Sequence, residues 1–424
     1  MRASLINGKL EKPTNVKLAK EIDVVEATIR NWKRDKPEQF EEALYDYRLK
    51  NAPFVPFSKF ENKNDIEFTE QDILEKRVPG ILNNDDTLLV PVNVEDILTN
   101  VDQIRNFNES NVISLANFKG GVGKSTTAIN LSSVLAFYGF NVLIVDFDIQ
   151  GNTTSMFDLY RYKRNKGIID LKISNIDELY DIEASDFKHT IVDLIAEIEN
   201  DKISEMVKDS IINLNDKSKT LGRLDILPNA SDIENALKFE DIDKHLKTFG
   251  NVNQALDEVL SHVKNDYDFV IIDTPPTISL PLRMSVLATD YFILALTPDK
   301  MAKDGIAPFL VPIEMNRKTY KKEKGKDIVV IGGVLNRYQK NVNIQRANKE
   351  GINEDLLYNT ENSNLGSTTL FEQVIKQDNV LSEAQYDMGS VLLYNPTHEL
   401  VRDYFNLTDE ILERIIIDKY SKQQ

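Results

Sequence analysis

The chain has 424 residues, with 51 Lys or Arg against 68 Asp or Glu and a formal net charge of −17 at pH 7. It contains no cysteine, which excludes disulfides, thiolate metal sites and iron–sulfur clusters. No apolar run reaches the ~18 residues of a membrane span, and no apolar core follows a basic start, so we expect a cytoplasmic protein. An acidic chain repels nucleic acid at long range, so a DNA contact would have to use local basic patches.

The first 50 residues have the spacing of three short helices, which we expect at 15–22, 25–34 and 37–50. A very tight turn at Asp23 joins the first two, and their apolar positions let them cross over one small core. This pattern resembles a helix-turn-helix. The face of the second helix that points away from this core carries side chains suited to base edges and phosphates: Thr28, Arg30, Asn31, Lys33 and Arg34. The alternative is a solvated basic helix in a small bundle.

A connector and a hairpin are expected next. Turn residues at 83–86 separate two apolar runs, which is typical of a hairpin. A hairpin behind a helix-turn-helix is how a wing is built, so we predict a winged helix-turn-helix DNA-binding domain over residues 1–105. The expected elements are a helix over 69–76 capped by Thr69, strands at 78–82 and 87–92, and a tethering helix over 94–107.

A glycine-rich stretch follows an apolar run at 112–116 and precedes helical spacing at 128–138, so its glycines fall in a strand-to-helix turn. Glycines leave backbone N–H groups free to wrap an anion at the positive end of the helix. A lysine and a hydroxyl then suit the outer phosphates and Mg2+. The residues expected around the phosphates are Gly120, Gly121, Val122, Gly123, Lys124, Ser125 and Thr126.

From this loop onward, short β-branched runs alternate with helical lengths. The expected strands are 112–116, 142–146, 224–227, 269–272, 291–296 and 329–334. This alternation predicts an α/β fold, a P-loop parallel sheet with helices on both faces. Residues 157–222 form a long acidic stretch that we interpret as a largely helical insertion, with helices at 190–198 and 203–212.

The loop resembles the deviant Walker A box of the ParA and MinD ATPases, because a second lysine, Lys119, stands directly before its first glycine. Three later stretches resemble other boxes of that family in order: 145–152, 269–276 and 333–338. The Gln-Gly-Asn ending of the first of these, together with Leu-Ser-Glu-Ala at 381–384, favours ParA over MinD.

The resemblance covers about residues 112–400 and implies a deviant Walker A ATPase domain over 106–424. It also implies membership of the larger ParA subclass, which has an amino-terminal winged module. ATP and Mg2+ are the expected cofactors.

The resemblance assigns roles to individual residues. Lys124, Ser125 and the ion would hold the outer phosphates, and Asp273 and Asp146 would lie at the metal. Asp148 would orient the attacking water, and Lys119 would reach the ATP of a partner subunit in a nucleotide-sandwich dimer. Asn336 would read the adenine edge. For the pair Asp146 and Asp148, loop hydrogen bonding is the structural alternative.

Dimers of ParA proteins bind DNA without sequence preference through basic residues of their carboxyl-terminal half. The candidates here are Arg337, Lys340, Arg346, Lys349 and Lys376. The segment 375–381 has fewer arginines than its family counterpart, and a solvated surface is the alternative for this cluster. The last helix, expected over 407–420, carries acidic residues that oppose binding to anionic lipid.

These expectations favour a nucleoid-associated partition ATPase for DNA, and in particular a plasmid. It would be an ATP-dependent dimer that a ParB-like centromere-binding protein stimulates and that represses its own operator. Two alternatives remain open at this stage. One is a nucleotide-gated repressor with vestigial hydrolysis, and the other is a positioning ATPase for a protein cargo.

Overall fold

The computed structural model describes residues 32–40, 53–60, 68–75, 77–82, 87–157, 159, 162–163, 181–182, 188–215, 220–230, 238, 241–242, 246, 251–277, 279–363, 365–387 and 389–423. Most of the predicted helix-turn-helix, with Thr28, Arg30 and Asn31, lies outside the described residues. Lys33 and Arg34 lie in a helical turn at 32–35 and are exposed, and Arg34 pairs with Asp35 at 2.7 Å. A DNA role for these residues and the domain boundary at 105 stay predictions.

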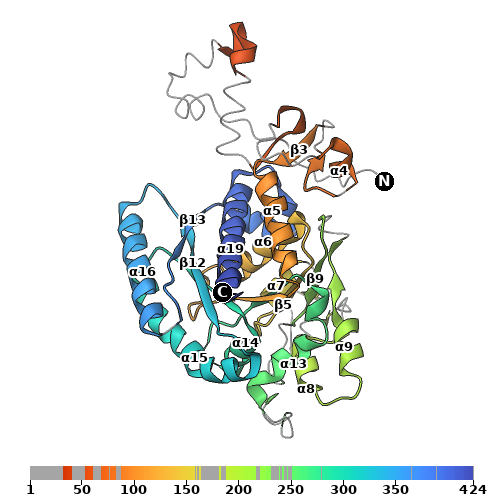
Figure 1. Cartoon of the computed structure of the whole chain (residues 1–424), viewed down its shortest axis with the longest axis vertical. Helices are drawn as coiled ribbons and strands as arrows, with labels where there is room; N and C mark the ends of the chain where they lie inside the picture. Colours follow the sequence, from red (N-terminus) through yellow and green to blue (C-terminus); the bar gives the residue numbers. More distant parts are fainter. Residues whose placement is uncertain are drawn as a thin grey trace, which may run out of the picture.

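An eight-stranded sheet forms the centre of the molecule (Figure 1). Its order is β13-β12-β11-β4-β10-β5-β9-β8, and every neighbouring pair is parallel except β8 with β9. The strands are β4 Asn111–Ala116, β5 Val142–Asp146, β8 Ile212–Asn213, β9 Leu224–Leu227, β10 Phe269–Asp273, β11 Tyr291–Leu296, β12 Val329–Tyr338 and β13 Leu370–Lys376. All six predicted strands are confirmed. The edge strands β8 and β13 were not predicted.

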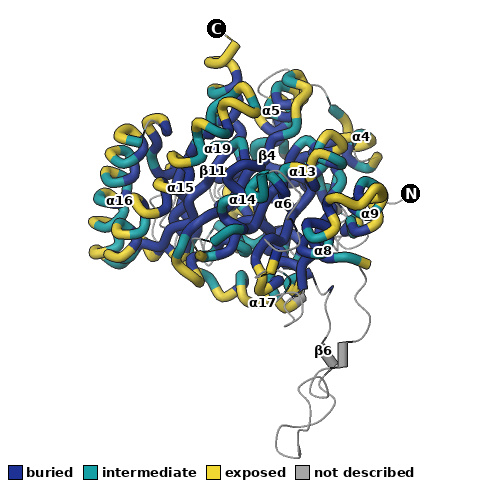
Figure 2. The backbone as a smooth tube through the Cα atoms, turned by 90° about the horizontal axis from the view of Figure 1, so that it is seen from below, coloured by how far each residue is buried: buried dark blue, intermediate teal, exposed yellow. Residues whose placement is uncertain are grey.

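Helices cover both faces of the sheet. Side chains alternate between faces along each strand, so Phe269 and Ile271 of β10 join one core while Val270 and Ile272 join another. Figure 2 shows the consequence, a buried centre under helices whose outer faces are exposed. The helices that follow the loop are α6 Lys124–Tyr138, α7 Asn152–Met156, α8 Ile191–Ala196, α9 Ile203–Ser210, α13 Ala255–Ser261, α14 Leu280–Ala288, α15 Met301–Lys324, α16 Asn343–Asn362, α17 Val380–Asp387, α18 Val391–Tyr394 and α19 Glu399–Gln423.

The predicted insertion contains the two expected helices, α8 and α9. The helical spacing extended to Ile212, but the helix ends at Ser210 because Ile212 begins β8 and pairs with β9. A short antiparallel pair, β6 Tyr162–Lys163 with β7 Asp181–Ile182, also belongs to this region.

A three-stranded antiparallel sheet precedes the large one, in the order β1-β3-β2. The predicted hairpin and both predicted helices are confirmed, although the first strand of the hairpin covers only Ile81–Leu82 of the expected 78–82. Thr69 caps its helix through a capping box with Asp72. The elements are β1 Phe54–Pro56, α4 Glu70–Leu74, β2 Ile81–Leu82, β3 Leu88–Pro91 and α5 Val94–Asn106. The pairing of β1 to the far side of β3 was not predicted.

This small sheet packs directly on the core of the large sheet. Phe54 is fully buried, and its ring meets those of Phe137 on α6 and Phe405 on α19 at centroid distances of 5.8 and 5.6 Å. Asn93, just before α5, and Tyr138 on α6 both donate hydrogen bonds to the carboxylate of Asp409 on α19. The end of the loop helix α6 therefore lies against the amino-terminal sheet.

The last helix, expected over 407–420, is longer: α19 runs from Glu399 to Gln423 and docks with one face buried along most of its length. Within the described part of the chain, none of the helices combines the length and the apolar character that crossing a membrane requires.

We predict that Phe54→Ala lowers the free energy of unfolding by about 3 kcal/mol, because the lost ring leaves a cavity between α6 and α19. Urea denaturation measures the change. Tyr386→Ala, at a side chain that is 93% exposed, is the control and should change stability by less than ~0.5 kcal/mol. Equal small effects for both variants would show that the small sheet does not depend on this contact.

Candidate active site

The glycine-rich loop connects β4 to α6. Gly121 and Gly123 have positive φ angles of 72° and 91°, and Gly123 is the residue directly before the helix. A Cβ atom at Gly123 would also lie 3.0 Å from Nδ2 of Asn336. The positive φ therefore favours glycine at this position, and a larger residue would also press on the Asn336 amide. The loop has the strand-to-helix context that the sequence predicts for a phosphate-binding turn.

Lys124 is 6% exposed at the first turn of α6. Burial lowers the pKa of Lys124, while the nearby carboxylates of Asp273 and Asp148 act in the opposite direction. A bound polyphosphate would add negative charge and favour the ammonium form. The lysine is thus placed where an anion would relieve its desolvation.

Asp146 and Asp273 are the last residues of the neighbouring parallel strands β5 and β10. The two residues are direct partners in the strand register. Because parallel strands end at the same edge of a sheet, the backbone alone brings both carboxylates beside the loop that follows β4.

Within the part of the chain that the structure describes, each of these carboxylates has one hydrogen-bonded oxygen and one oxygen without a partner. Oδ2 of Asp146 accepts hydrogen bonds from the backbone N–H and hydroxyl of Thr154 at 2.8 and 2.7 Å. Oδ2 of Asp273 accepts from the hydroxyl of Thr153 at 2.8 Å. The Oδ1 atoms of both residues are buried and have no hydrogen-bond partner among the described residues.

Burial, reinforced by mutual repulsion of the carboxylates, raises the pKa of Asp146 to about 8. Burial likewise raises the pKa of Asp273 to about 6, against hydrogen bonds from Ser125 and Thr153. Two buried oxygens without partners, next to a hydroxyl, fit a hard cation such as Mg2+. No cluster of three or more His, Asp or Glu side chains suited to a metal occurs in the described residues, so phosphate and water would complete the coordination.

Asp148 lies two residues beyond the end of β5 and is 4% exposed. Its Oδ1 accepts a hydrogen bond from the backbone N–H of Gln150 at 3.0 Å, and Asn229 donates to its carbonyl at 2.9 Å. Burial raises the pKa of Asp148. The loop hydrogen bond expected as the structural alternative is present, and Oδ2 remains for a second partner. The role of Asp148 in water positioning stays a prediction.

Lys119 is exposed at the start of the loop, directly before Gly120. Its ammonium pairs with Asp299 Oδ2 at 2.7 Å, and both side chains are nearly half exposed. Exposed ion pairs contribute only about 0–1 kcal/mol, so Lys119 can exchange this partner for another anion at little cost.

Asn336 lies beside the loop at the end of β12. Its amide donates hydrogen bonds to the carbonyl of Val122 at 2.9 Å and to the hydroxyl of Thr127 at 3.2 Å. Asn336 therefore supports the loop backbone, which the sequence did not reveal. Its contact with a base stays a prediction.

A cavity of about 280 Å³ opens next to Asn336 and the loop, and we call it the P-loop pocket. The segment 375–381, considered from sequence as a DNA surface poor in arginine, contributes Ile375 and Gln377 to this pocket. Gln385 lines it as well and donates to the hydroxyl of Thr126 at 2.8 Å. Only the Leu-Ser-Glu-Ala stretch at 381–384 could have indicated these residues from sequence.

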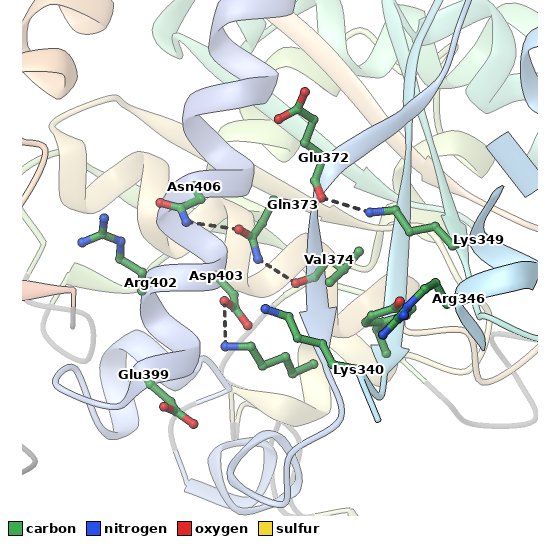
Figure 3. Close-up of a pocket in the computed structure, with 12 residues that line it drawn as sticks. Lys340, Arg346, Lys349, Glu372, Gln373, Val374, Glu399, Arg402, Asp403 and Asn406 are labelled. Carbon is green, nitrogen blue, oxygen red and sulfur yellow. Dashed lines mark hydrogen bonds and ion pairs between the residues drawn. The ribbon is translucent and has the colours of Figure 1, made fainter. Parts of the chain in front are cut away.

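Four of the five predicted basic residues of the carboxyl-terminal half meet in a second cavity, of about 480 Å³. This basic recess is lined by Tyr338, Lys340, Arg346, Lys349, Glu372, Gln373, Val374, Lys376, Glu399, Arg402, Asp403 and Asn406. Figure 3 shows Arg346 and Lys349 on one side of β13, Arg402 and Asn406 on α19 at the other side, and the Lys340 side chain between the two groups. Arg337 lies apart from them, because it lines the P-loop pocket.

Arg402 is a fifth cation of the recess that sequence reasoning missed. It lies on α19, far along the chain from the other four, and no motif marks it. Only the packing of α19 beside β13 brings it to this surface.

We predict that Asp146→Asn stabilises the ligand-free protein at high pH. The raised pKa means that the folded chain keeps a proton that the unfolded chain releases near pH 4, so folding stability falls as pH rises through about 8. Asparagine can keep the bonds from Thr154 without ionising. The variant should exceed the parent by at least about 1 kcal/mol at pH 9 and match it at pH 4.

Thermal melts across this pH range, without nucleotide or metal, measure the difference. Asp304→Asn, on the exposed face of α15, is the control and should leave the melting temperature nearly unchanged at each pH. If the difference in melting temperature between Asp146→Asn and the parent does not grow with pH, the raised pKa assigned to Asp146 is wrong.

Comparison with known proteins agrees with this geometry. The family model described as an AAA domain matches residues 110–325, just over half of the chain. The sporulation initiation inhibitor protein Soj of Bacillus subtilis is 24% identical over 305 residues, which cover 71% of this chain and 97% of Soj. The chromosome partitioning protein ParA of Caulobacter vibrioides is 25% identical over 307 residues, 72% of this chain and 96% of that protein.

Among solved structures, McdA from Cyanothece in complex with ATP has the same fold, with a TM-score of 0.50 at 16% identity, and covers 72% of this chain and 96% of its own. The chain belongs to the ParA family of P-loop ATPases.

Proposed function

We propose that this protein is an ATPase for DNA partition, with a plasmid as the foremost candidate cargo, and that it works as an ATP-dependent dimer. One observation carries the proposal. Two buried carboxylates, each with an oxygen that no described residue hydrogen-bonds, lie at adjacent strand ends beside the buried lysine of a phosphate-binding loop. ATP and Mg2+ are its cofactors, and the intrinsic turnover is weak.

Each residue of the site has a separate role in phosphoryl transfer to water. The loop N–H groups and Lys124 bind the outer phosphates and hold the terminal one in line. Ser125, Asp146 and Asp273 would hold Mg2+, which neutralises charge on the phosphate oxygens. Asp148 orients the attacking water through Oδ2, while its other oxygen is fixed by the N–H of Gln150.

Lys119 acts on the partner subunit. When two ATP-bound protomers face each other, its ammonium leaves Asp299 and meets the phosphates bound by the partner. ATP then links two chains, and loss of the terminal phosphate separates them. A coupling of even ~3 kcal/mol changes the dimer population more than a hundredfold.

The dimer binds duplex DNA without sequence preference and so associates with the nucleoid in the cytoplasm. The basic recess supports this part of the proposal, because it gathers positive charge on a chain of net charge −17. A ParB-like centromere-binding protein stimulates hydrolysis and releases the DNA. The amino-terminal region, through Thr28, Arg30, Asn31, Lys33 and Arg34, binds the operator of its own genes.

We expect Lys119→Ala to bind ATP but to remain monomeric with it, because the partner's phosphates lose their second lysine. Asp148→Ala should dimerise on ATP and hydrolyse it about 100-fold more slowly, since the water loses its orienting group. Light scattering with ATP and phosphate-release assays measure the two effects. Dimerisation of Lys119→Ala at the parent's ATP concentration would refute the role of that lysine in trans.

We expect the parent protein to bind a random-sequence duplex with ATP but not with ADP or without nucleotide, at one fixed salt concentration. Fluorescence anisotropy measures this binding. Binding that ignores the nucleotide, or the absence of binding to this duplex, would instead favour a nucleotide-gated repressor with vestigial hydrolysis.

The double variant Lys340→Gln with Arg346→Gln should weaken duplex binding by about tenfold and flatten its salt dependence, because two phosphate contacts are lost. Lys318→Gln with Lys322→Gln removes the same charge from the exposed face of α15 and is the matched control. Equal losses in both double variants would mean that overall charge, and not the recess, attracts DNA.

A further inference from the structure

Asn229 lies in the loop that follows β9, at the same edge of the large sheet as the active site. Strand β9 pairs with β5 in parallel, and the register ends with Leu227 opposite Val145. A residue just beyond Leu227 therefore meets the turn that follows β5, which spans residues 147–151. Asn229 is fully buried there, although no sequence motif marks it.

The side chain of Asn229 holds the backbone of Asp148. Its Nδ2 donates a hydrogen bond to the carbonyl oxygen of Asp148 at 2.9 Å. The same carbonyl accepts from the N–H of Gly151 at 2.9 Å, and the Asp148 carboxylate accepts from the N–H of Gln150 at 3.0 Å. Gly151 and Gln150 belong to the turn that contains Asp148. Asn229 is thus the partner that ties this turn to a neighbouring strand.

The amide of Asn229 has a fixed orientation. Its Oδ1 accepts a hydrogen bond from the N–H of Ala230 at 3.0 Å. A rotated amide would place its oxygen against the carbonyl of Asp148 and its nitrogen against the N–H of Ala230, and neither pair can form a hydrogen bond. The geometry therefore assigns Asn229 as the donor to Asp148.

The backbone of Asn229 is anchored in turn to Thr154 of α7. Its N–H donates to the hydroxyl of Thr154 at 2.9 Å, and that hydroxyl donates to Oδ2 of Asp146 at 2.7 Å. Thr154 and Asp146 are both fully buried. A hydroxyl that accepts one bond and donates another strengthens both, because each bond polarises the other. A continuous chain of buried hydrogen bonds therefore joins Asp146 to the backbone of Asp148.

This chain fixes the turn at a point where regular strand pairing has ended. On the β10 side, the last backbone bond is from the N–H of Phe147 to the carbonyl of Asp273 at 3.0 Å. On the β9 side, the Asn229 amide supplies the bond to the following residue, Asp148. Loss of that amide would leave the Asp148 carbonyl with its bond from within the turn. The direction of the carboxylate would then depend on the turn alone.

We propose that Asn229 is a positioning residue for ATP hydrolysis, which keeps the carboxylate of Asp148 directed at the attacking water by holding the Asp148 backbone. This inference rests on the proposed function, which gives Asp148 the role of orienting that water. Asn229 acts through Asp148 and is not itself a catalytic residue.

We expect full-length Asn229→Ala to lower kcat about tenfold, because a displaced carboxylate orients the water poorly. The KM for ATP and dimerisation on ATP should stay near the parent's values, since the phosphate loop is unchanged. Phosphate release and light scattering measure these effects, and thermal melts check that the variant is folded. Asn359→Ala is the matched control, because that amide also donates to a backbone carbonyl, of Asp355 at 2.7 Å on α16, and its kcat should equal the parent's.

The same substitution in Asp148→Ala protein tests whether Asn229 acts through Asp148. We expect Asn229→Ala to lower the residual kcat by less than about twofold in this background, because the group that it positions is absent. Single-turnover assays measure the slow rates. A tenfold loss in both backgrounds would mean that the two residues act independently, and it would overturn the assignment.

A label in the turn tests the position of the turn without turnover. The chain contains no cysteine, so Ile149→Cys introduces a single thiol beside Asp148, at a side chain that is 40% exposed. We expect a nitroxide on this thiol to become more mobile in nucleotide-free protein when Asn229→Ala is added, and to be unchanged by Asn359→Ala. Equal label mobility with and without the Asn229 amide would refute its role in holding the turn.

The proposed function and this inference fail differently. If Asp148→Ala turns over slowly but Asn229→Ala hydrolyses ATP at the parent's rate, the inference is wrong and the proposed role of Asp148 stands. If Asp148→Ala itself hydrolyses ATP at the parent's rate, both the role of Asp148 and its positioning by Asn229 are wrong.

Discussion

Asp146 and Asp273 impose the constraint on which the active site depends. The register of β5 and β10 places both carboxylates at one sheet edge, and burial raises the pKa of each. Lys124 is also buried, and burial shifts its pKa in the opposite direction, downward, because it disfavours the charged ammonium form. A bound cation would favour the ionised form of both carboxylates, and a bound polyphosphate would favour the charged form of Lys124. The ligand-free site is thus electrostatically unfavourable in a way that favours binding of both cofactors together.

The loop helix α6 connects this edge with the opposite end of the molecule. Its first residue is Lys124, and its last turn contains Phe137 and Tyr138, which contact the amino-terminal sheet and α19. Phe54 reaches into the same core as the strands of the large sheet. The small amino-terminal sheet and α5 therefore behave as a layer of the ATPase core, and their packing depends on the position of α6.

The P-loop pocket and the basic recess also share structural elements. The ends of β12 and β13 contribute to the P-loop pocket with one set of side chains and to the basic recess with the next. For binding of an anion to a strongly acidic chain, a local group of cations matters more than the net charge. The reason is that salt screens the repulsion from acidic residues farther away than about one Debye length. A binding site for phosphate can therefore exist on a chain of net charge −17.

The sequence by itself determined the parts that depend on local pattern. Hydrophobic period and glycine spacing located the phosphate loop, six strands of the sheet, the capped helix behind Thr69 and the hairpin of β2 and β3. The tertiary structure alone decided which contacts form between segments that are far apart in the sequence. Asn336 holds the carbonyl of Val122, Phe54 enters the core, and Arg402 joins the recess, although each lies far along the chain from its partners. Such contacts arise from strand order and helix docking, which leave no periodic signal, so β13 and its contribution to both cavities could be found only in the folded chain.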